Sequence, residues 1–265
     1  FILRADIYSL ELKKFKEAID DYNKAIELDP KDASIFINLG VSEKYLERYE
    51  EAIEAFDKAI KLDPQNSESF NKRGLVKVSL KRFKEATLDF DKAIKLNSKG
   101  SSYFVNSGAS KHGLNRYEEA MKDFDQAIKL DKENYLAFNN RGYTKYNLGR
   151  HEEAIKDYDQ AIKLDPKLSI AFSNRGLAKD ELKRYEEAIK DYDQAIKLDK
   201  ENSLAFNNRG YTKSNLGRYD EAIKDYDRAI KLDPKFAIAF NGRGLAKYNL
   251  GRNEEAIKDY DRAIK

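Results

Sequence analysis

The sequence contains no cysteine, and only four of its 265 residues are proline. Without cysteine the chain can form neither a disulfide nor a thiolate metal site, so its redox compartment stays open. No run approaches the roughly 18 apolar residues that are needed to span a bilayer. The first ten residues carry Arg4 and Asp6 within their apolar stretch, which argues against a signal peptide. These absences favour a cytoplasmic protein without a membrane partner.

An excess of one charge is also lacking. Lysine and arginine together number 50, aspartate and glutamate 47, and the net charge is only +3. Proteins that bind nucleic acid or anionic membranes carry a clear excess of basic residues. The charge balance therefore gives no electrostatic reason to expect either partner.

What the sequence does contain is one segment repeated many times. The stretch from Tyr135 to Leu168 matches the rest of the chain when it is moved in steps of 34 residues. We number positions within each repeat from Tyr135 as position 1. A fixed period of this length indicates stacked structural repeats, which grow unit by unit and have no single central core. Glycine occupies position 8 at Gly40, Gly74, Gly108, Gly142, Gly176, Gly210 and Gly244.

Three further positions are equally regular. Position 20 is always alanine, position 24 is always phenylalanine or tyrosine, position 27 is always alanine, and position 32 is often proline. The residues are Ala18, Ala52, Ala86, Ala120, Ala154, Ala188, Ala222 and Ala256 at position 20; Tyr22, Phe56, Phe90, Phe124, Tyr158, Tyr192, Tyr226 and Tyr260 at position 24; and Pro30, Pro64, Pro166 and Pro234 at position 32. This pattern resembles the tetratricopeptide repeat (TPR) family over essentially the whole chain.

The resemblance implies an all-α fold, a right-handed α-α superhelix built from antiparallel helix pairs. We expect one solenoid over residues 1–265, and infer that it is a piece of a longer protein because residue 1 corresponds to position 3 and Lys265 to position 29. The repeats are 33–66, 67–100, 101–134, 135–168, 169–202 and 203–236, with partial repeats at 1–32 and 237–265.

Within one repeat the apolar spacing predicts two helices, from Ala137 to Leu148 and from about Glu152 to Leu164. Glycine at position 8 lowers helix stability, so its recurrence predicts a close approach of the two helices. Gly149 follows the first helix and is suited to the left-handed conformation that ends many helices. The same turn is occupied by Gly217, Gly251, Asn115, Lys13, Glu47, Lys81 and Lys183.

Position 7 departs from the leucine that the family favours. It is arginine in five repeats, and each of those repeats has aspartate at position 23, which predicts an ion pair between the two helices. Ala5 with Asp21 and Ser107 with Asp123 break the correlation. The predicted pairs are Arg73–Asp89, Arg141–Asp157, Arg175–Asp191, Arg209–Asp225 and Arg243–Asp259.

A second period of 68 residues lies over the first. Repeats 135–168 and 203–236 differ at only six positions, among them Tyr146 against Ser214 and His151 against Tyr219. The C-terminal half therefore reads as a duplicated block of two repeats, and the more diverse N-terminal half is a place where repeat-specific contacts could lie.

In the TPR family the first helix of each repeat lines an inner groove, which implies that positions 2, 5, 6, 9, 12 and 13 face a ligand. Here those positions are rich in asparagine and tyrosine and poor in charge. The predicted peptide-binding residues are Asn38, Asn106, Asn139, Asn140, Tyr143, Asn174, Asn207, Asn208, Tyr211 and Asn241. An asparagine amide both donates and accepts, so it can hold a peptide unit whatever its side chain.

The row at position 6 is similar to the asparagine ladder of O-linked N-acetylglucosamine transferases, although Lys72 and Gly242 interrupt it. The alternative is that these asparagines serve the helices themselves. Another use of the family fold, a clamp for the acidic C-termini of 70 and 90 kDa chaperones, requires lysine at positions 2 and 5 and asparagine at position 9. This sequence has none of these.

Catalysis is not expected. His151 occupies a position that is aromatic in most repeats, which predicts a packing role, and the pattern places no carboxylate or nucleophile beside His112. We expect no cofactor and no metal. The sequence thus predicts a non-enzymatic scaffold for an extended peptide or protein partner. Two alternatives stay open: an assembly module that self-associates end to end through its open repeat ends, and the substrate-recruiting arm of a larger enzyme.

Overall fold

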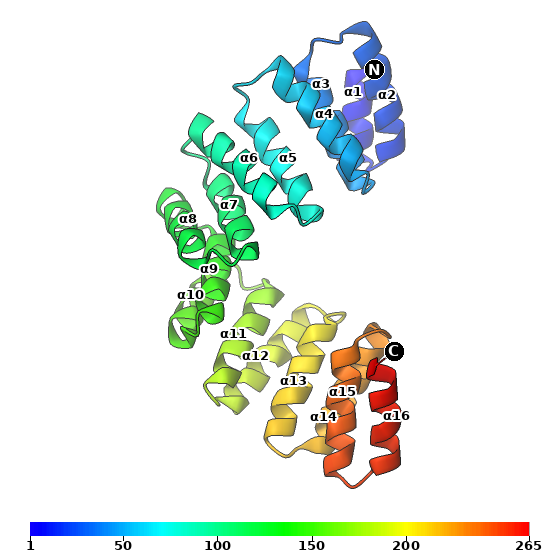
Figure 1. Cartoon of the computed structure of the whole chain (residues 1–265), viewed down its shortest axis with the longest axis vertical. Coiled ribbons are helices and arrows are strands. Elements are labelled where there is room, and N and C mark those ends of the chain that lie inside the picture. Colours follow the sequence, from blue (N-terminus) through cyan, green and yellow to red (C-terminus); the bar gives the residue numbers. More distant parts are fainter. Residues whose placement is uncertain (265) are drawn as a thin grey trace. The chain divides into compact units, whose positions relative to one another are not determined.

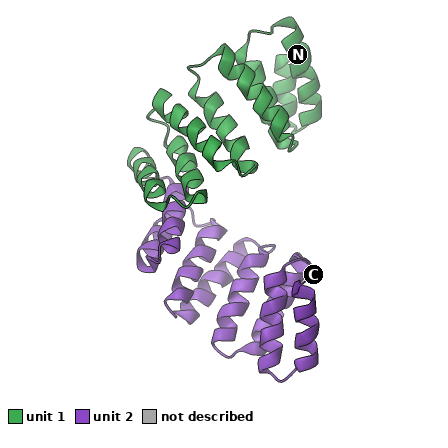
Figure 2. Cartoon of the chain, viewed as in Figure 1, with its two compact units in different colours: residues 1–132 green, residues 133–265 purple. Residues whose placement is uncertain are grey.

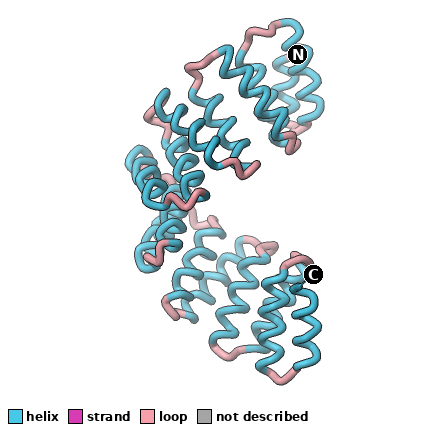
Figure 3. The backbone as a smooth tube through the Cα atoms, viewed as in Figure 1, coloured by secondary structure: helices cyan, strands magenta, loops and turns pink. Residues whose placement is uncertain are grey.

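The computed structural model describes residues 1–264, which form helices joined by short turns (Figures 1 and 3). The first helices of the repeats are α1 (Ile2–Asp6) with the π-helical η1 (Ile7–Glu11), α3 (Ala33–Tyr45), α5 (Ser67–Ser79), α7 (Ser101–Gly113), α9 (Tyr135–Asn147), α11 (Ser169–Glu181), α13 (Ser203–Asn215) and α15 (Ala237–Asn249). The second helices are α2 (Phe15–Leu28), α4 (Tyr49–Leu62), α6 (Phe83–Leu96), α8 (Tyr117–Leu130), α10 (His151–Leu164), α12 (Tyr185–Leu198), α14 (Tyr219–Leu232) and α16 (Asn253–Ile264).

The chain divides into two compact units, residues 1–132 and 133–265 (Figure 2). In the N-terminal unit α2 packs against α1 and α3, α4 against α3 and α5, and α6 against α5 and α7. In the C-terminal unit α10 packs against α9 and α11, α12 against α11 and α13, and α14 against α13 and α15. Short turns between paired helices make the pairs antiparallel. The predicted all-α solenoid of helix pairs is confirmed, and the division of the whole chain into repeats of one domain stays a prediction.

Glycine at position 8 lies directly against the aromatic ring at position 24 of the same repeat. A Cβ atom added at Gly176 would lie 2.7 Å from Cε1 of Tyr192, and one at Gly74 would lie 2.6 Å from Cε1 of Phe90. These separations are too short for any side chain, so the close approach predicted from the sequence is confirmed. The same contact recurs at Gly40, Gly108, Gly142, Gly210 and Gly244.

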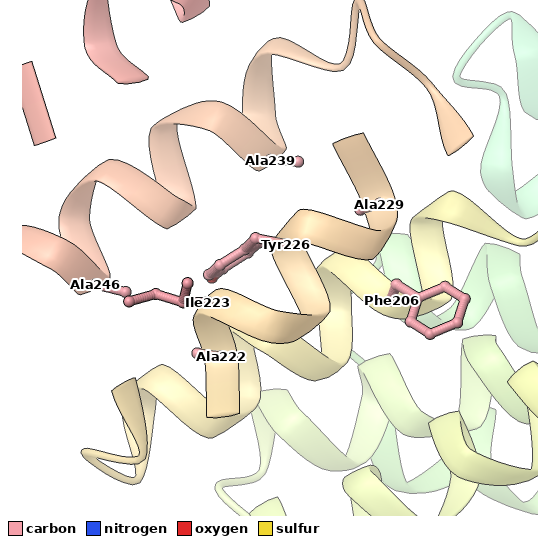
Figure 4. Close-up of a cluster of buried hydrophobic side chains, with 7 residues drawn as sticks. All are labelled: Phe206, Ala222, Ile223, Tyr226, Ala229, Ala239 and Ala246. Atoms are coloured by element: carbon pink, nitrogen blue, oxygen red, sulfur yellow. The ribbon is translucent and has the colours of Figure 1, made fainter. Parts of the chain in front are cut away.

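The ring at position 24 then joins one repeat to the next. In one cluster Tyr226 and Ile223 of α14 pack with alanines of α14 and α15, and Phe206 of α13 packs beside them (Figure 4). Tyr226 is almost fully buried. Because small residues surround each ring, the core is a series of such clusters along the chain, as expected for a repeat array.

The turn after each first helix adopts the left-handed conformation that the sequence predicted. Gly149, Gly217 and Gly251 have φ of 73°, 72° and 76°. Added Cβ atoms there would meet nothing within 4 Å, so these glycines serve the backbone conformation and not a steric need. Lysine, glutamate and asparagine adopt the same conformation at Lys13, Glu47, Lys81, Asn115 and Lys183, with φ between 52° and 59°.

Ion pairs between the helices of a repeat follow the predicted arrangement. The guanidinium Nε of Arg175 donates to Oδ2 of Asp191 at 2.9 Å, and Lys179 Nζ lies 2.9 Å from the same carboxylate. Asp191 is buried. Equivalent Arg–Asp contacts of 2.9–3.0 Å join Arg73 to Asp89, Arg141 to Asp157, Arg209 to Asp225 and Arg243 to Asp259.

The two repeats that broke the sequence correlation also pair their aspartates. Arg4 Nε donates to Asp21 Oδ2 at 2.5 Å, and Lys111 Nζ donates to Asp123 Oδ2 at 2.7 Å. Lysine at position 11 was not among the predicted partners of these aspartates. Its signal was present, because position 11 is lysine in the six repeats from residue 67 onward, all of which have aspartate at position 23, whereas it is Glu43 in the repeat without that aspartate and Ser9 in the first repeat.

Replacing a non-glycine residue in the left-handed turn with glycine tests how much strain that turn carries. We expect Lys183→Gly to raise the free energy of unfolding by about 0.5–1 kcal/mol, because the left-handed strain removed slightly exceeds the unfolded-state entropy that glycine adds. Gly217→Lys is the matched reverse and should lower it by a similar amount. Urea denaturation followed by circular dichroism measures both, and a stabilising Gly217→Lys would contradict the account.

Loss of the buried carboxylate should cost much more than loss of an exposed one. Asp191→Asn leaves Arg175 and Lys179 facing a neutral group, so we expect the free energy of unfolding to fall by about 3 kcal/mol. Asp193→Asn on the same helix removes an exposed partner of Arg209 and should cost less than about 1 kcal/mol. Equal losses in urea denaturation would show that the buried network has no special weight.

Candidate functional site

The first helices form the inner layer of each unit. In the C-terminal unit α9 contacts α11, α11 contacts α13, and α13 contacts α15, while in the N-terminal unit α3 contacts α5 and α5 contacts α7. Among the described residues no second helix approaches the next second helix as closely. Closer spacing in one layer places that layer on the concave side within a unit. The candidate site is therefore the surface of the first helices within each unit.

The two layers of the C-terminal unit expose different chemistry. Every exposed side chain on α10, α12 and α14 is charged. On α9, α11, α13 and α15 the only exposed charged residue is Glu181, and the other exposed residues are aliphatic, tyrosine or asparagine. They are Leu136, Tyr143, Asn147, Ile170, Leu204, Tyr211, Asn215, Ala237, Ile238, Asn241, Leu245, Tyr248 and Asn249.

The predicted peptide-binding residues fall into three groups by exposure. Tyr143 and Tyr211 are 41% and 55% exposed, and Asn241 is also exposed. The half-buried group is Asn38, Asn106, Asn140 and Asn208, and the buried group is Asn139, Asn174 and Asn207. The side chains of the buried group are largely covered by their neighbours, and the peptide-binding role of all ten residues stays a prediction.

Several of these asparagines tie one first helix to the next. Asn174 Nδ2 on α11 donates to Asn139 Oδ1 on α9 at 3.2 Å, and Asn106 Nδ2 on α7 donates to Asn71 Oδ1 on α5 at 2.8 Å. Such bonds satisfy buried amides that would otherwise lose hydrogen bonds to water. For these residues the structure supports the alternative reading, in which asparagine serves the helices.

One row of the surface was not singled out from the sequence. Position 2 of the four first helices in the C-terminal unit carries an exposed aliphatic side chain, 44–65% exposed: Leu136, Ile170, Leu204 and Ile238. The signal was available, since position 2 was among those expected to face the groove. A large apolar side chain at each repeat adds a hydrophobic component to the expected hydrogen-bonding surface.

Burial shifts the pKa of two titratable side chains in this layer. Burial, with a further effect from Glu181, raises the pKa of Tyr146 to about 12, so its phenol stays protonated. Burial also lowers the pKa of His112 below 6.5, and its ring lies 5.1 Å from that of Tyr117. His151 packs at 5.2 Å from Tyr146, in agreement with the predicted packing role.

Two structural features are missing from the described residues, 1–264. No group of three or more histidine, cysteine, aspartate or glutamate side chains is placed to hold a metal ion. None of the helices in that range has the length and apolar character required to cross a membrane.

Comparison with known families gives matches along most of the chain. A family described as "Tetratricopeptide repeat" matches residues 33–66, 135–168 and 169–202, and related descriptions of the same repeat match 67–99 and 191–224. A family described as "TPR repeat" matches 9–42, 108–149 and 214–251. No curated protein has a matching sequence.

Similar solved structures include small and large helical-repeat proteins. YrrB, described as "a TPR protein with an unusual peptide-binding site", is 27% identical, with a TM-score of 0.54 over 69% of this chain and 95% of its own. MamA is 25% identical, with a TM-score of 0.54 over 59% of this chain and 92% of its own.

Larger proteins share the fold at lower identity. The APC/C component structure Cut9–Hcn1 is 18% identical with a TM-score of 0.78, and yeast Tom70 is 22% identical with a TM-score of 0.68. This chain spans 46% and 55% of those two chains.

Proposed function

Because the chain belongs to the tetratricopeptide repeat family, we propose that it is a non-enzymatic scaffold that binds an extended segment of a partner polypeptide on its first-helix layer. The observation that carries this proposal is the contrast between the two layers of the C-terminal unit. The exposed side chains of α10, α12 and α14 are all charged, whereas those of α9, α11, α13 and α15 are aliphatic, tyrosine or asparagine, with Glu181 as the one exposed charge.

That composition fits a polypeptide ligand better than other ligands. Exposed tyrosines provide large, rigid contacts with a polar end, and they are frequent in surfaces that bind proteins. The exposed amides of Asn147, Asn215, Asn241 and Asn249 both donate and accept, as a peptide backbone requires. A description of YrrB as peptide-binding supports the same class of ligand for this chain.

Recognition by the exposed tyrosines can be tested with peptides selected from a random phage-displayed library on the immobilised chain. We expect the combined variant Tyr143→Ala, Tyr211→Ala and Tyr248→Ala to bind the selected peptides at least about tenfold more weakly. The reason is that truncation of an aromatic contact commonly costs over about 1 kcal/mol of binding free energy. Fluorescence anisotropy gives the dissociation constants. Circular dichroism checks that the exposed substitutions leave the fold intact.

The matched control changes the charged layer instead. The control combines Lys156→Ala, Lys190→Ala and Lys224→Ala, which change exposed residues at equivalent positions of α10, α12 and α14. It should leave the dissociation constants within about twofold of those of the unaltered chain. Failure to select any peptide, or loss of binding only with the lysine variant, would overturn the proposed function.

A second candidate, association between copies of the chain, rests on a different observation. Large apolar side chains are exposed on the outermost helices, including Leu3 (81%) and Leu10 (75%) on α1 and η1 and Ile257 (59%) on α16. Exposed apolar surface of this kind favours association. Light scattering should then show a mass that rises with concentration, and Leu3→Lys with Leu10→Lys should remove the rise. A constant monomer mass would contradict this candidate.

A further inference from the structure

A pocket of about 370 Å³ lies between α13 and α15, at the first-helix layer of the C-terminal unit. Its size is at the lower end of the range of about 300–1,000 Å³ found for small-molecule sites. None of its lining residues is charged, although 37% of the chain is. The lining comprises Asn207, Tyr211, Ser214, Asn215, Tyr219, Tyr226, Ile238, Asn241, Gly242, Leu245 and Asn249.

The internal duplication shows how the pocket arises. In the preceding block, 68 residues earlier, Tyr146 stands where Ser214 stands here. The Tyr146 ring lies parallel to that of Tyr143 at 6.4 Å, tilts against His151 at 5.2 Å, and packs on the buried cluster of that block. Serine at 214 leaves the corresponding ring out, and Tyr211 and Tyr219 line the space beside it.

A second difference between the two blocks leaves a buried hydrogen-bond acceptor without its donor. Asn174 Nδ2 donates to Asn139 Oδ1 at 3.2 Å in the first block. In the second block Asn207 takes the place of Asn139. Gly242 takes the place of Asn174 and has no side-chain amide to donate a hydrogen bond. Asn207 is 7% exposed, lines the pocket, and its Oδ1 has no hydrogen-bond partner. A buried acceptor of this kind is strongly favoured to pair with a donor from a ligand.

Glycine at 242 also allows the Tyr226 ring to lie at the wall of the pocket. A Cβ atom there would lie 2.6 Å from Cε1 and Cζ of Tyr226 and 2.9 Å from its hydroxyl oxygen. The Tyr226 ring thus rests against the bare backbone of α15, and burial raises the pKa of Tyr226 to about 12. The wall therefore presents a neutral phenol at physiological pH.

We propose that this pocket takes a tyrosine side chain of the partner polypeptide, its ring in the space left by Tyr146 and its hydroxyl donating to Asn207 Oδ1. The proposal rests on the proposed function, which supplies the polypeptide. A tyrosine provides both things that the second block has lost, an aromatic ring and a hydrogen-bond donor. The uncharged lining disfavours a carboxylate or a phosphotyrosine, since neither would meet a cation in the pocket.

The test titrates the whole chain with N-acetyl-L-tyrosinamide, followed by amide NMR spectra. We expect saturable shifts centred on Asn207, Tyr211 and Asn241. N-acetyl-L-phenylalaninamide lacks the hydroxyl donor and should bind about two- to tenfold more weakly, and the phosphotyrosine amide should give no saturable shift. Absence of saturable shifts with the tyrosine amide, or equal binding of tyrosine and phenylalanine amides, would overturn the proposal.

The duplication provides variants whose side chains the fold already accommodates at equivalent places. Ser214→Tyr should fill the pocket as Tyr146 fills its counterpart. Gly242→Asn should give Asn207 its donor and must also displace the Tyr226 ring, because the new Cβ atom would lie 2.6 Å from it. Each should weaken the binding of N-acetyl-L-tyrosinamide at least about tenfold. Tyr146→Ser should leave that binding unchanged. Unaltered binding in a folded Ser214→Tyr variant would place the ligand elsewhere and overturn the inference.

This test separates the inference from the function on which it rests. The amide probes report on the pocket whether or not a longer polypeptide binds the layer. Selected peptides that bind to the exposed tyrosines but not to the pocket would sustain the proposed function and overturn the tyrosine inference. If no peptide is selected while the amide still occupies the pocket, the proposed function fails, and the preference of the pocket for a tyrosine ring and hydroxyl is sustained.

Discussion

The contact between glycine at position 8 and the aromatic ring at position 24 sets the distance between the two helices of each repeat. At Gly176 the contact leaves no room for a side chain, because a Cβ atom added there would lie 2.7 Å from the Tyr192 ring. Glycine weakens a helix, so the contact is sustained by the burial of the ring among alanines. The contact recurs in every repeat from residue 33 onward, whereas the first repeat has Asp6 at position 8 and a first helix divided into α1 and η1.

Charge is distributed around this packing in a way that separates two surfaces. Aspartates at position 23 lie inside the repeats, where arginine at position 7 and lysine at position 11 pair with them, as Arg175 and Lys179 pair with Asp191. The second helices of the C-terminal unit carry exposed charges of both signs. Its first helices expose almost none. A charged outer layer keeps a repeat array soluble, which allows the opposite layer to keep the apolar and amide groups that recognition requires.

Much of the fold could be predicted from one sequence because a repeat samples the same site many times. The left-handed turn at Lys183, the close approach at Gly176 and the pairing of Arg175 with Asp191 all follow from spacing. The recurrence of lysine at position 11 was a signal that Lys111 replaces arginine beside Asp123, although spacing alone does not say which cation on a face reaches the carboxylate. The sequence could not tell that Asn174 turns its amide toward Asn139, since the next helix, and not the residue type, decides whether an amide is buried.

The candidate site shows the same limit. Ser214 was visible as a departure from Tyr146 and Gly242 as a break in the asparagine row, but the pocket and the unpaired Asn207 Oδ1 depend on their meeting between α13 and α15. A crystal structure of the chain with a peptide selected on it would test the central claim most directly. The account predicts a peptide lying across α13 and α15 with a tyrosine side chain beside Asn207. A peptide bound on the charged faces of α12 and α14 would contradict it.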